Sequence, residues 1–236
     1  LLIRCKKIHV LSLFNFKKLI EFCPQAKPHT LRIPGAASSS LSNSKTNFKS
    51  SKEFGRVRIL CVGRLHPRKG QDQLLQAIHK LDRDIQKNLE VIFAGPPIKT
   101  RYAKKLENLR NESESNVVFK GDCSENQLID LYNKSDLFCL TSMPRANSVE
   151  GFGFVYLEAS SYKLPIIANR TGGVEDTVLE NETGILCDPG NINQLSKAIK
   201  LLVEDSELRQ KLGARGKEWA LKHRWELSAK ELYQGL

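Results

Sequence analysis

The sequence predicts an α/β protein built on a Rossmann-like parallel sheet with helices on both faces. Apolar runs rich in β-branched residues alternate with segments of helical periodicity from residue 57 to the end of the chain. Glycine or charged residues follow several of the apolar runs, where such sheets carry their ligand-binding loops. This alternation favours parallel strands joined by helical crossovers, and residues 57–236 are enough for one domain of ordinary size.

The first unit of this alternation begins at residue 57. Residues 57–63, VRILCVG, form a continuous apolar run, which is typical of a strand buried on both faces. Residues 71–81 then place aliphatic side chains on one helical stripe, which predicts an amphipathic helix. The same patterns predict strands at 89–95, 116–121, 136–141, 165–169 and 184–188, and helices at 100–110, at 124–134, from about Gly151, and from 191 onward.

Residues 1–35 predict a smaller unit of strand, helix and strand, a short N-terminal remnant beside the main domain. The helix presents one apolar face between Phe16 and Cys23, and the second strand ends at a Pro-Gly turn. Residues 36–56 are rich in Ser, Asn and Lys, and we interpret them as a flexible linker. The predicted organisation is therefore 1–35, 36–56 and 57–236.

The net charge of +11 is concentrated in the N-terminal part of the chain. Residues 1–56 hold 11 Lys and Arg against 2 Asp and Glu, a net of +9, which leaves 26 against 24, or +2, for the rest. A nearly neutral main domain without a basic and aromatic stripe argues against a nucleic-acid partner. The basic segment suits an anionic membrane surface or an acidic partner, and a solvated tail is the simpler interpretation.

The six cysteines are scattered without a CxxC pair, and several stand inside predicted strands. This pattern favours buried free thiols in a reducing compartment, and hence a cytoplasmic protein, over disulfides or a metal site. No apolar run reaches the roughly 18 residues of a membrane span, so peripheral contact with the cytoplasmic face of a membrane is the alternative location. Because the chain begins with Leu1 and its only methionine is Met143, we expect a fragment or a processed chain.

The loop after the first predicted strand of the main domain, GRLHPRKG, carries a cluster of cations. Gly63 ends the strand, Arg64 and Lys69 stand five residues apart, and another glycine precedes the next helix. Glycine lets the backbone approach an anion, and two cations beside a helix N-terminus can balance a diphosphate. A solvated basic loop explains this segment alone equally well, and the segment matches neither GxGxxG nor GxxxxGK[ST].

Two glutamates bracket a Gly-Phe-Gly sequence in residues 148–160, SVEGFGFVYLEAS. A helix beginning near Gly151 would place Glu150 at its start and Glu158 two turns along, roughly 12 Å away at 1.5 Å per residue. Carboxylate pairs of glycoside hydrolysis stand about 5 to 9.5 Å apart, so we expect these two to contact different parts of one long ligand. Exposed amides of Phe152 and Gly153 would lie between them and favour negative charge. A nucleotide sugar has this shape.

Together these motifs resemble the donor-binding domain of the family 4 retaining glycosyltransferases, which have the GT-B fold. The resemblance rests on Gly-Arg followed five residues later by Lys-Gly, on Glu-x7-Glu around Gly-Phe-Gly, and on EASSYKLPIIANRTGGVEDTV and ETGILCDPGN. It covers residue 57 to about 236, and around residues 148–160 it is loosely similar to the bacterial phosphatidylinositol mannosyltransferases. Residues 1–35 resemble the last strand, helix and strand of the family's N-terminal acceptor domain.

The resemblance implies a catalytic group of Arg64, Lys69 and Glu150. The two cations would bind the donor diphosphate and stabilise its departure, and Glu150 would contact sugar hydroxyls near the reacting carbon. Transfer would retain the anomeric configuration, because the acceptor would attack on the face from which the diphosphate leaves. Glu158 would hold the ribose. The donor-binding residues that the resemblance implies are Gly63, Gly151, Phe152, Gly153 and Glu158.

The implied reaction transfers a hexose from a nucleotide-diphosphate sugar, such as a UDP- or GDP-hexose, to a lipid or glycan acceptor. No metal or other cofactor is expected. The only DxD sequence, at residues 82–84, falls near the end of a predicted helix and is interpreted as a solvated face, and the five histidines lack metal-ligand spacing. Gly172-Gly173 forms either a turn that approaches the donor or only a tight turn.

Two other functions stay open at this stage. One alternative is a nucleotide-sugar-binding module without catalysis, whether a degenerate paralogue, one subunit of a split enzyme or an inactive fragment that lacks the acceptor domain. A generic flavodoxin-like binding domain is the third interpretation, and in it neither Glu150 nor Glu158 would contribute to ligand affinity.

Overall fold

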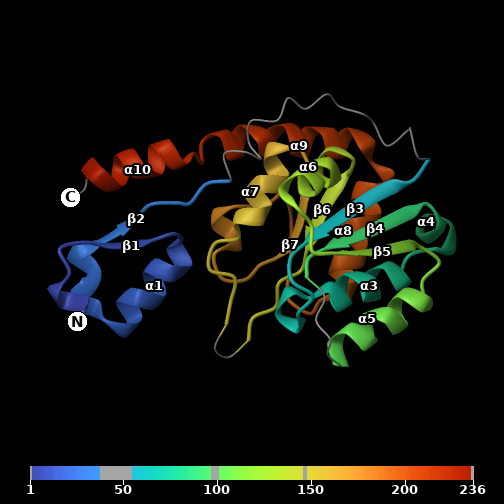
Figure 1. The fold of residues 1–236 in the computed structure, drawn as a ribbon, viewed down its shortest axis with the longest axis horizontal. Coiled ribbons are helices and arrows are strands. Elements are labelled where there is room, and N and C mark those ends of the chain that lie inside the picture. The colour runs from blue at the N-terminus through green and yellow to red at the C-terminus, as the bar shows by residue number, and fades with distance from the viewer. Residues whose placement is uncertain (1, 38–54, 97–100, 146–147, 235–236) are drawn as a thin grey trace.

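The computed structural model describes residues 2–37, 55–96, 101–145 and 148–234, and it confirms the predicted fold class. A six-stranded sheet has the order β5-β4-β3-β6-β7-β8, and every pairing in it is parallel. Figure 1 shows the sheet at the centre of the larger domain. Its strands are β3 (Val57–Val62), β4 (Leu89–Ala94), β5 (Asn116–Gly121), β6 (Leu137–Leu140), β7 (Ile166–Asn169) and β8 (Gly184–Cys187).

Helices cover both faces of this sheet (Figure 1). One face carries α3 (Gln71–His79), α5 (Arg101–Asn111) and α8 (Ile192–Glu204), and the other carries α6 (Glu125–Asn133), α7 (Phe154–Ser161) and α9 (Ser206–Leu221). Ser124 and Gln127 form a reciprocal capping box at the start of α6. The remaining described elements after residue 56 are η4 (Pro67–Lys69), α4 (Arg83–Lys87), η5 (Val174–Asp176) and α10 (Trp225–Gln234), which lies over the N-terminal residues (Figure 1).

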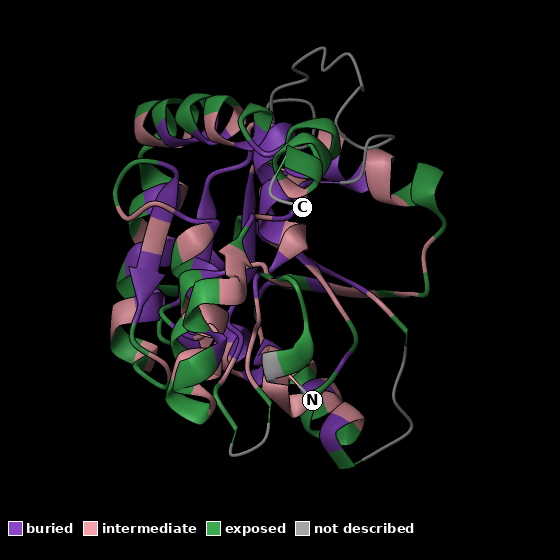
Figure 2. Ribbon diagram, turned by 90° about the vertical axis from the view of Figure 1, so that its left-hand side faces the viewer, coloured by how far each residue is buried: buried purple, intermediate pink, exposed green. Residues whose placement is uncertain are grey.

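The hydrophobic core lies between the helical layers, and Figure 2 shows the sheet strands largely in purple. All residues of β6 and β7 are buried, as expected for strands covered on both faces. Cys61, Cys139 and Cys187 are buried on three strands of the sheet, and no disulfide joins cysteines of the described residues. Across the described segments, no helix has both the length and the apolar character needed to cross a membrane.

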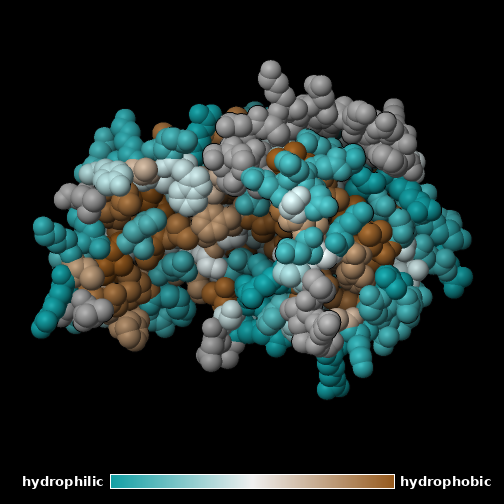
Figure 3. Space-filling model, in the orientation of Figure 1, coloured by the Kyte–Doolittle hydropathy of each residue, from teal (hydrophilic) through white to brown (hydrophobic). Residues whose placement is uncertain are grey.

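The N-terminal residues form the predicted strand, helix and strand as a small unit with its own two-stranded sheet. It contains η1 (Leu2–Arg4), β1 (Ile8–Val10), α1 (Leu13–Phe22), η2 (Pro24–His29) and β2 (Thr30–Arg32), and β1 pairs with β2 in parallel. No residue of α1 is buried, and apolar surface gathers on this unit beneath α10 (Figure 3). Most of the linker predicted at 36–56 lies outside the described residues.

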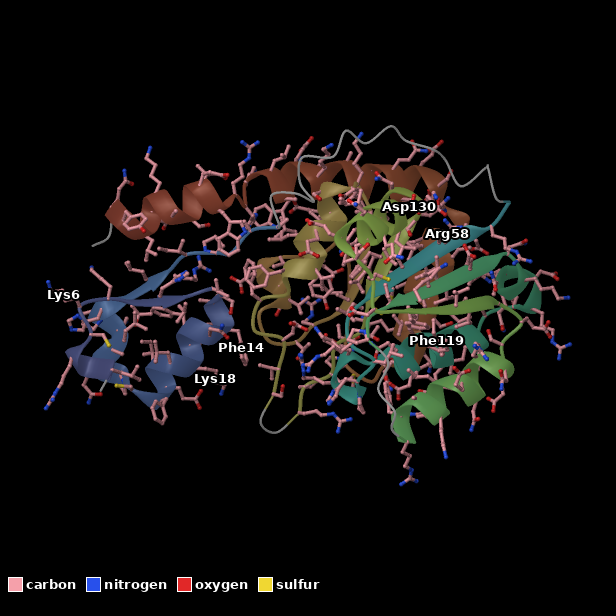
Figure 4. All side chains as sticks on the ribbon, viewed as in Figure 1. Lys6, Phe14, Lys18, Arg58, Phe119 and Asp130 are labelled. Atoms are coloured by element: carbon pink, nitrogen blue, oxygen red, sulfur yellow. The ribbon has the colours of Figure 1, made fainter. Side chains whose placement is uncertain are left out.

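Part of the basic excess lies on the outside of this N-terminal unit. Lys6 and Lys18 lie on its outer surface, whereas Phe14 lies at the end of α1 nearer to the larger domain (Figure 4). Lys18 pairs with Glu21 at 2.7 Å, and both side chains are more than half exposed. An exposed pair of this kind contributes little to the stability of the fold.

The close packing of α9 on α7 gives a test of the fold. A Cβ at Gly213 would lie 2.0 Å from the carbonyl oxygen of Lys163, whereas a Cβ at Gly216 would lie 3.4 Å from Ser160 Oγ. We expect Gly213→Ala to lower the free energy of unfolding by about 1–3 kcal/mol, because overpacking displaces α9. Gly216→Ala should be neutral or stabilising by up to about 1 kcal/mol, because alanine favours helix. Urea unfolding measures both, and equal losses would contradict the packing described.

Candidate functional site

The strand order of the sheet changes direction at β3 and β6: strands β4 and β5 are added on one side of β3, and β6, β7 and β8 on the other. Strands β3 and β6 are neighbours, yet β3 leads to α3 on one face and β6 leads to α7 on the other. The two connections diverge, and open α/β sheets bind ligands in the crevice that this divergence leaves at the carboxyl ends of the strands. Residues 63–70, here called the cation loop, and residues 150–153, the Gly-Phe-Gly segment, meet at this point.

Two glycines shape the cation loop. Gly70 has φ of 68°, and a Cβ there would lie 2.0 Å from the carbonyl oxygen of Thr141 at the end of β6. The side chain of Lys69 runs over Gly63, where a Cβ would lie 3.7 Å from Lys69 Cδ and Cε. The cation loop therefore lies directly against the end of β6, with the lysine stem folded back across the end of β3.

Lys69 and Glu150 form the central contact of the site. Lys69 Nζ lies 2.6 Å from Glu150 Oε2, and the two side chains are 14% and 13% exposed. Arg68 Nη1 approaches the same oxygen at 3.4 Å, and Ser142 Oγ donates to it at 3.0 Å. One carboxylate oxygen thus joins the cation loop to the segment that precedes α7.

These contacts outweigh the cost of burying the Glu150 carboxylate. Burial is the largest single influence and raises the pKa of Glu150, but Lys69, the Ser142 hydroxyl and Arg68 together bring the pKa below its usual value. Glu150 is therefore a carboxylate at neutral pH, held in place by two cations.

Arg64 adds to the positive field of the cation loop without joining the ion pair. Its side chain is exposed and makes no ion pair with any residue in the described part of the chain. Partial desolvation, together with the charges of Arg64, Arg68 and Arg145, lowers the pKa of His66 in the same loop. Arg64, Arg68 and Lys69, with Arg145, thus make this end of the site positive, and among the described residues Glu150 is the carboxylate that pairs with Arg68 and Lys69.

Helix α7 begins at Phe154 rather than near Gly151, which corrects the sequence prediction. Gly153 is the N-cap with φ of 88°, and it separates the Gly-Phe-Gly segment from the helix. The carbonyl oxygen of Gly151 accepts from Ser12 Oγ at 2.7 Å, and that of Glu150 accepts from the Gly173 amide at 2.8 Å. Because Ser12 and Gly173 donate to the carbonyls of Gly151 and Glu150, the helix does not begin at these two residues, and the 12 Å spacing derived from a continuous helix does not apply.

The loop after β7 fixes the backbone of the Gly-Phe-Gly segment. Gly172 has φ of 58°, and a Cβ there would lie 2.0 Å from the carbonyl oxygen of Glu150. A Cβ at Gly173 would lie 2.2 Å from the carbonyl oxygen of Gly151. The two glycines are needed for close approach of the two backbones, so this turn is part of the site's scaffold.

Phe152 and Gly153 directly precede the first residue of α7, so their backbone amides lie at the start of that helix. The Phe152 side chain is 2% exposed and packs edge-on against Phe154, with ring centroids 5.2 Å apart. No side chain caps the first turn of α7. Amides at an uncapped helix start favour an anion, so the predicted role of this segment is compatible with its geometry.

Glu158 lies in the second turn of α7 and contacts a different element from Glu150. Its Oε2 accepts from the hydroxyl of Tyr132, on α6, at 3.2 Å. Burial raises the pKa of Glu158, and the Tyr132 hydrogen bond only partly offsets this. The two glutamates therefore have opposite electrostatic settings, with an ion pair at Glu150 and a single neutral donor at Glu158.

The N-terminal unit reaches the same segment. Besides Ser12, which donates to Gly151, the backbone amide of Leu13 lies 3.1 Å from both carboxylate oxygens of Asp176 on η5. Arg32 pairs with Asp176 at 3.3 Å. The start of α1 is thus anchored beside the Gly-Phe-Gly segment.

The structure brings together most of the predicted site residues but not all of their predicted contacts. Lys69, Glu150 and the glycines converge. Arg64 lies in the same loop but does not pair with Glu150, whose cationic partners are Lys69 and Arg68. Sequence reasoning missed Arg68 and Ser142. Ser142 directly follows the strand predicted at 136–141, so the rule that ligand sites lie at strand ends could have found it.

The DxD sequence has a structural partner away from the crevice. Asp82 precedes α4 and pairs with Lys200 at 2.8 Å, with the Asp82 side chain 72% exposed. Within the part of the chain that the structure describes, no group of three or more His, Cys, Asp or Glu side chains could hold a metal ion.

Comparison with known proteins identifies relatives over most of the chain. The family model described as glycosyl transferases group 1 matches residues 43–219. A GDP-mannose-dependent alpha-(1-6)-phosphatidylinositol monomannoside mannosyltransferase of Mycobacterium tuberculosis is 32% identical over 182 residues, which are 75% of this chain and 46% of that protein. A D-inositol 3-phosphate glycosyltransferase of Corynebacterium glutamicum is 32% identical over 200 residues, 80% and 46% of the two chains. The chain spans about half the length of these relatives.

Solved structures resemble almost the whole chain. Anabaena HepE in complex with UDP aligns with a TM-score of 0.85 and 20% identity, covering 98% of this chain and 63% of that one. A sucrose-phosphate synthase from Thermosynechococcus elongatus aligns with a TM-score of 0.80 and 24% identity, covering 99% and 58%. At these identities the likeness establishes the fold alone.

The ion pair of Glu150 predicts a dependence of stability on acid pH. A carboxyl whose folded-state pKa is depressed stabilises the fold above its unfolded-state pKa, about 4.3. We expect Glu150→Gln to lower the free energy of unfolding at pH 7 by about 1–3 kcal/mol. That difference from wild type should shrink as the pH falls from about 5 through the folded-state pKa. Urea unfolding between these limits measures it, and a difference independent of pH would contradict the assignment.

Glu158 predicts the opposite dependence of stability on pH, because its pKa is raised rather than lowered. Its raised pKa means that the charged form is disfavoured in the folded state, so stability is lost as the pH rises from about 4.3 through the folded-state pKa. Glu158→Gln keeps an acceptor for Tyr132 and should raise the free energy of unfolding at pH 7 by about 1 kcal/mol. The gain should disappear at pH 4. Thermal unfolding at both pH values tests this, and destabilisation at pH 7 would refute it.

Proposed function

We propose a function for this chain from one premise, that it belongs to the glycosyl transferases group 1 family. The proposed function is that of the donor-binding half of a retaining glycosyltransferase. It binds a nucleotide-diphosphate sugar, such as a UDP- or GDP-hexose, for transfer of the hexose to a lipid or glycan acceptor. The observation that supports it most is the meeting of Lys69, Glu150 and the start of α7 at the carboxyl ends of β3 and β6.

In this proposal the diphosphate lies between the cation loop and α7. Lys69 is already oriented by its ion pair with Glu150, and Arg64 is exposed in the same loop and available to a phosphate. Cations and helix amides fixed before binding stabilise the charge that grows on the leaving diphosphate without reorganisation. Loss of either cation would raise the barrier by about 3 kcal/mol.

The two glutamates take the two ends of the donor. Glu150, at the cation loop, contacts hydroxyls of the sugar, and its ionised state makes it an acceptor only. Glu158, with a single neutral donor in the protein, accepts from the ribose hydroxyls. Neutral hydroxyl donors suit a half-buried carboxylate that lacks a cation of its own.

The domain boundaries are part of the proposal. Residues 57–236 form the donor-binding domain, and residues 1–35 belong to an acceptor domain whose last strand, helix and strand they represent. The apolar surface of this small unit, and the contacts of α1 with the Gly-Phe-Gly segment, support its place beside the donor site. The names of the relatives support a UDP- or GDP-linked donor, and a lipid acceptor would agree with the basic N-terminal segment.

Calorimetric titration with UDP-glucose and GDP-mannose, together with an assay of donor hydrolysis, tests the function. We expect one donor to bind, and Lys69→Met to weaken it by about 10- to 100-fold, because a charge-assisted contact is lost. Lys200→Met is the matched control, because Lys200 pairs with Asp82 outside the site and should leave affinity unchanged.

The outcomes separate the three functions. Binding without hydrolysis or transfer favours a non-catalytic nucleotide-sugar-binding module. Binding that survives both Glu150→Gln and Glu158→Gln favours a generic binding domain. Failure of every nucleotide sugar to bind would refute the proposed function and the module alike.

A further inference from the structure

The end of β7 contributes a buried amide that the proposed donor contacts do not use. Asn169 is the last residue of β7 and is 2% exposed. Its Nδ2 donates to the carbonyl oxygens of Thr141 at 3.0 Å and Ser142 at 3.3 Å, and it lies 3.4 Å from Met143 Sδ. Burying an amide costs free energy unless it is hydrogen-bonded, and here the bonds of Asn169 hold the backbone of Thr141 and Ser142 in place. Residues 141–143 are here called the junction.

The junction holds the cation loop on one side. Thr141 Oγ1 donates to the carbonyl oxygen of Gly70 at 2.7 Å, and the Met143 amide donates to that of Arg68 at 2.7 Å. These two bonds flank Lys69 in sequence. The position of the lysine is therefore set by the path of the junction.

The junction holds Glu150 on its other side. Ser142 Oγ donates to Glu150 Oε2 at 3.0 Å, the same oxygen that pairs with Lys69. Asn169 bonds to the carbonyl of Ser142 itself. A displacement of the junction would move the Ser142 hydroxyl and Lys69 together, and so loosen both contacts of the carboxylate.

We propose that Asn169 is a positioning residue for the donor diphosphate, which acts by fixing the junction and thereby the geometry of Lys69 and Glu150. This inference rests on the proposed function for its ligand. Its effect on Glu150 in the free protein does not depend on any ligand, and this allows the two to be tested separately.

Two variants and one control test the role of Asn169. Asn169→Leu keeps the number and branching of the side-chain heavy atoms and removes both N–H donors, and Asn169→Ser keeps one donor. Gln86→Leu is the matched control, because Gln86 is a buried amide, 6% exposed, that donates to the Leu81 carbonyl oxygen at 2.9 Å on α4. All three variants should lower the melting temperature. A purely structural role of Asn169 would change stability alone and leave the Glu150 pKa and the nucleotide affinities unchanged.

The decisive readouts are the titration of Glu150 and the binding of nucleotide fragments. In Asn169→Leu we expect the pKa of Glu150, followed by carbon-detected NMR, to rise toward its usual value. The affinity for UDP or GDP should fall about tenfold, while that for the matching nucleoside stays unchanged. Asn169→Ser should lie between wild type and Asn169→Leu, and Gln86→Leu should match wild type in both readouts.

The results that would overturn the inference are equally specific. An unchanged Glu150 pKa together with an unchanged ratio of nucleoside diphosphate to nucleoside affinity, in either Asn169 variant, would refute it. If Asn169→Leu does not fold, Asn169→Ser carries the test. If wild type binds no nucleoside diphosphate and no nucleotide sugar, the proposed function fails, and the Glu150 titration still decides whether Asn169 positions that carboxylate.

Discussion

The ion pair between Lys69 and Glu150 is the interaction on which the site depends. It lies at the carboxyl ends of β3 and β6, where the strand order changes direction, and it joins the loop after β3 to the segment that follows β6. A salt bridge can hold two loops only if their backbones are already positioned. Here glycines bring each loop against its neighbour, with Gly70 on the end of β6 and Gly172 on the backbone of Glu150.

The sequence predicted the strands well because burial on both faces produces continuous apolar runs. The six parallel strands and the small N-terminal unit appear where the patterns placed them, within a residue or two. The start of α7 was predicted wrongly, because local periodicity contains no information on carbonyls that accept from Ser12 and Gly173. Arg68 and Asn169 were missed for the same reason, since their roles arise from contacts with segments far apart in sequence. Ser142 was missed although it directly follows a predicted strand.

The two glutamates of the proposed donor site lie in different electrostatic surroundings, as contacts with the sugar-diphosphate and ribose parts of one ligand would require. Cations gather at the cation loop, where Glu150 pairs with Lys69 and Arg68, whereas Glu158 in the second turn of α7 accepts from the neutral Tyr132 hydroxyl. Burial disfavours the charge on Glu158, so the fold retains a carboxylate at a cost in stability. Costs of this kind are common where a residue serves binding rather than folding.

The central claim is that the cation loop and Glu158 receive opposite ends of one nucleotide, and a crystal structure with the bound nucleoside diphosphate tests it most directly. The account predicts phosphate oxygens within hydrogen-bond distance of Lys69 Nζ and ribose hydroxyls on the Glu158 carboxylate. A nucleotide bound elsewhere, or bound in the crevice with its phosphates turned away from Lys69, would contradict it.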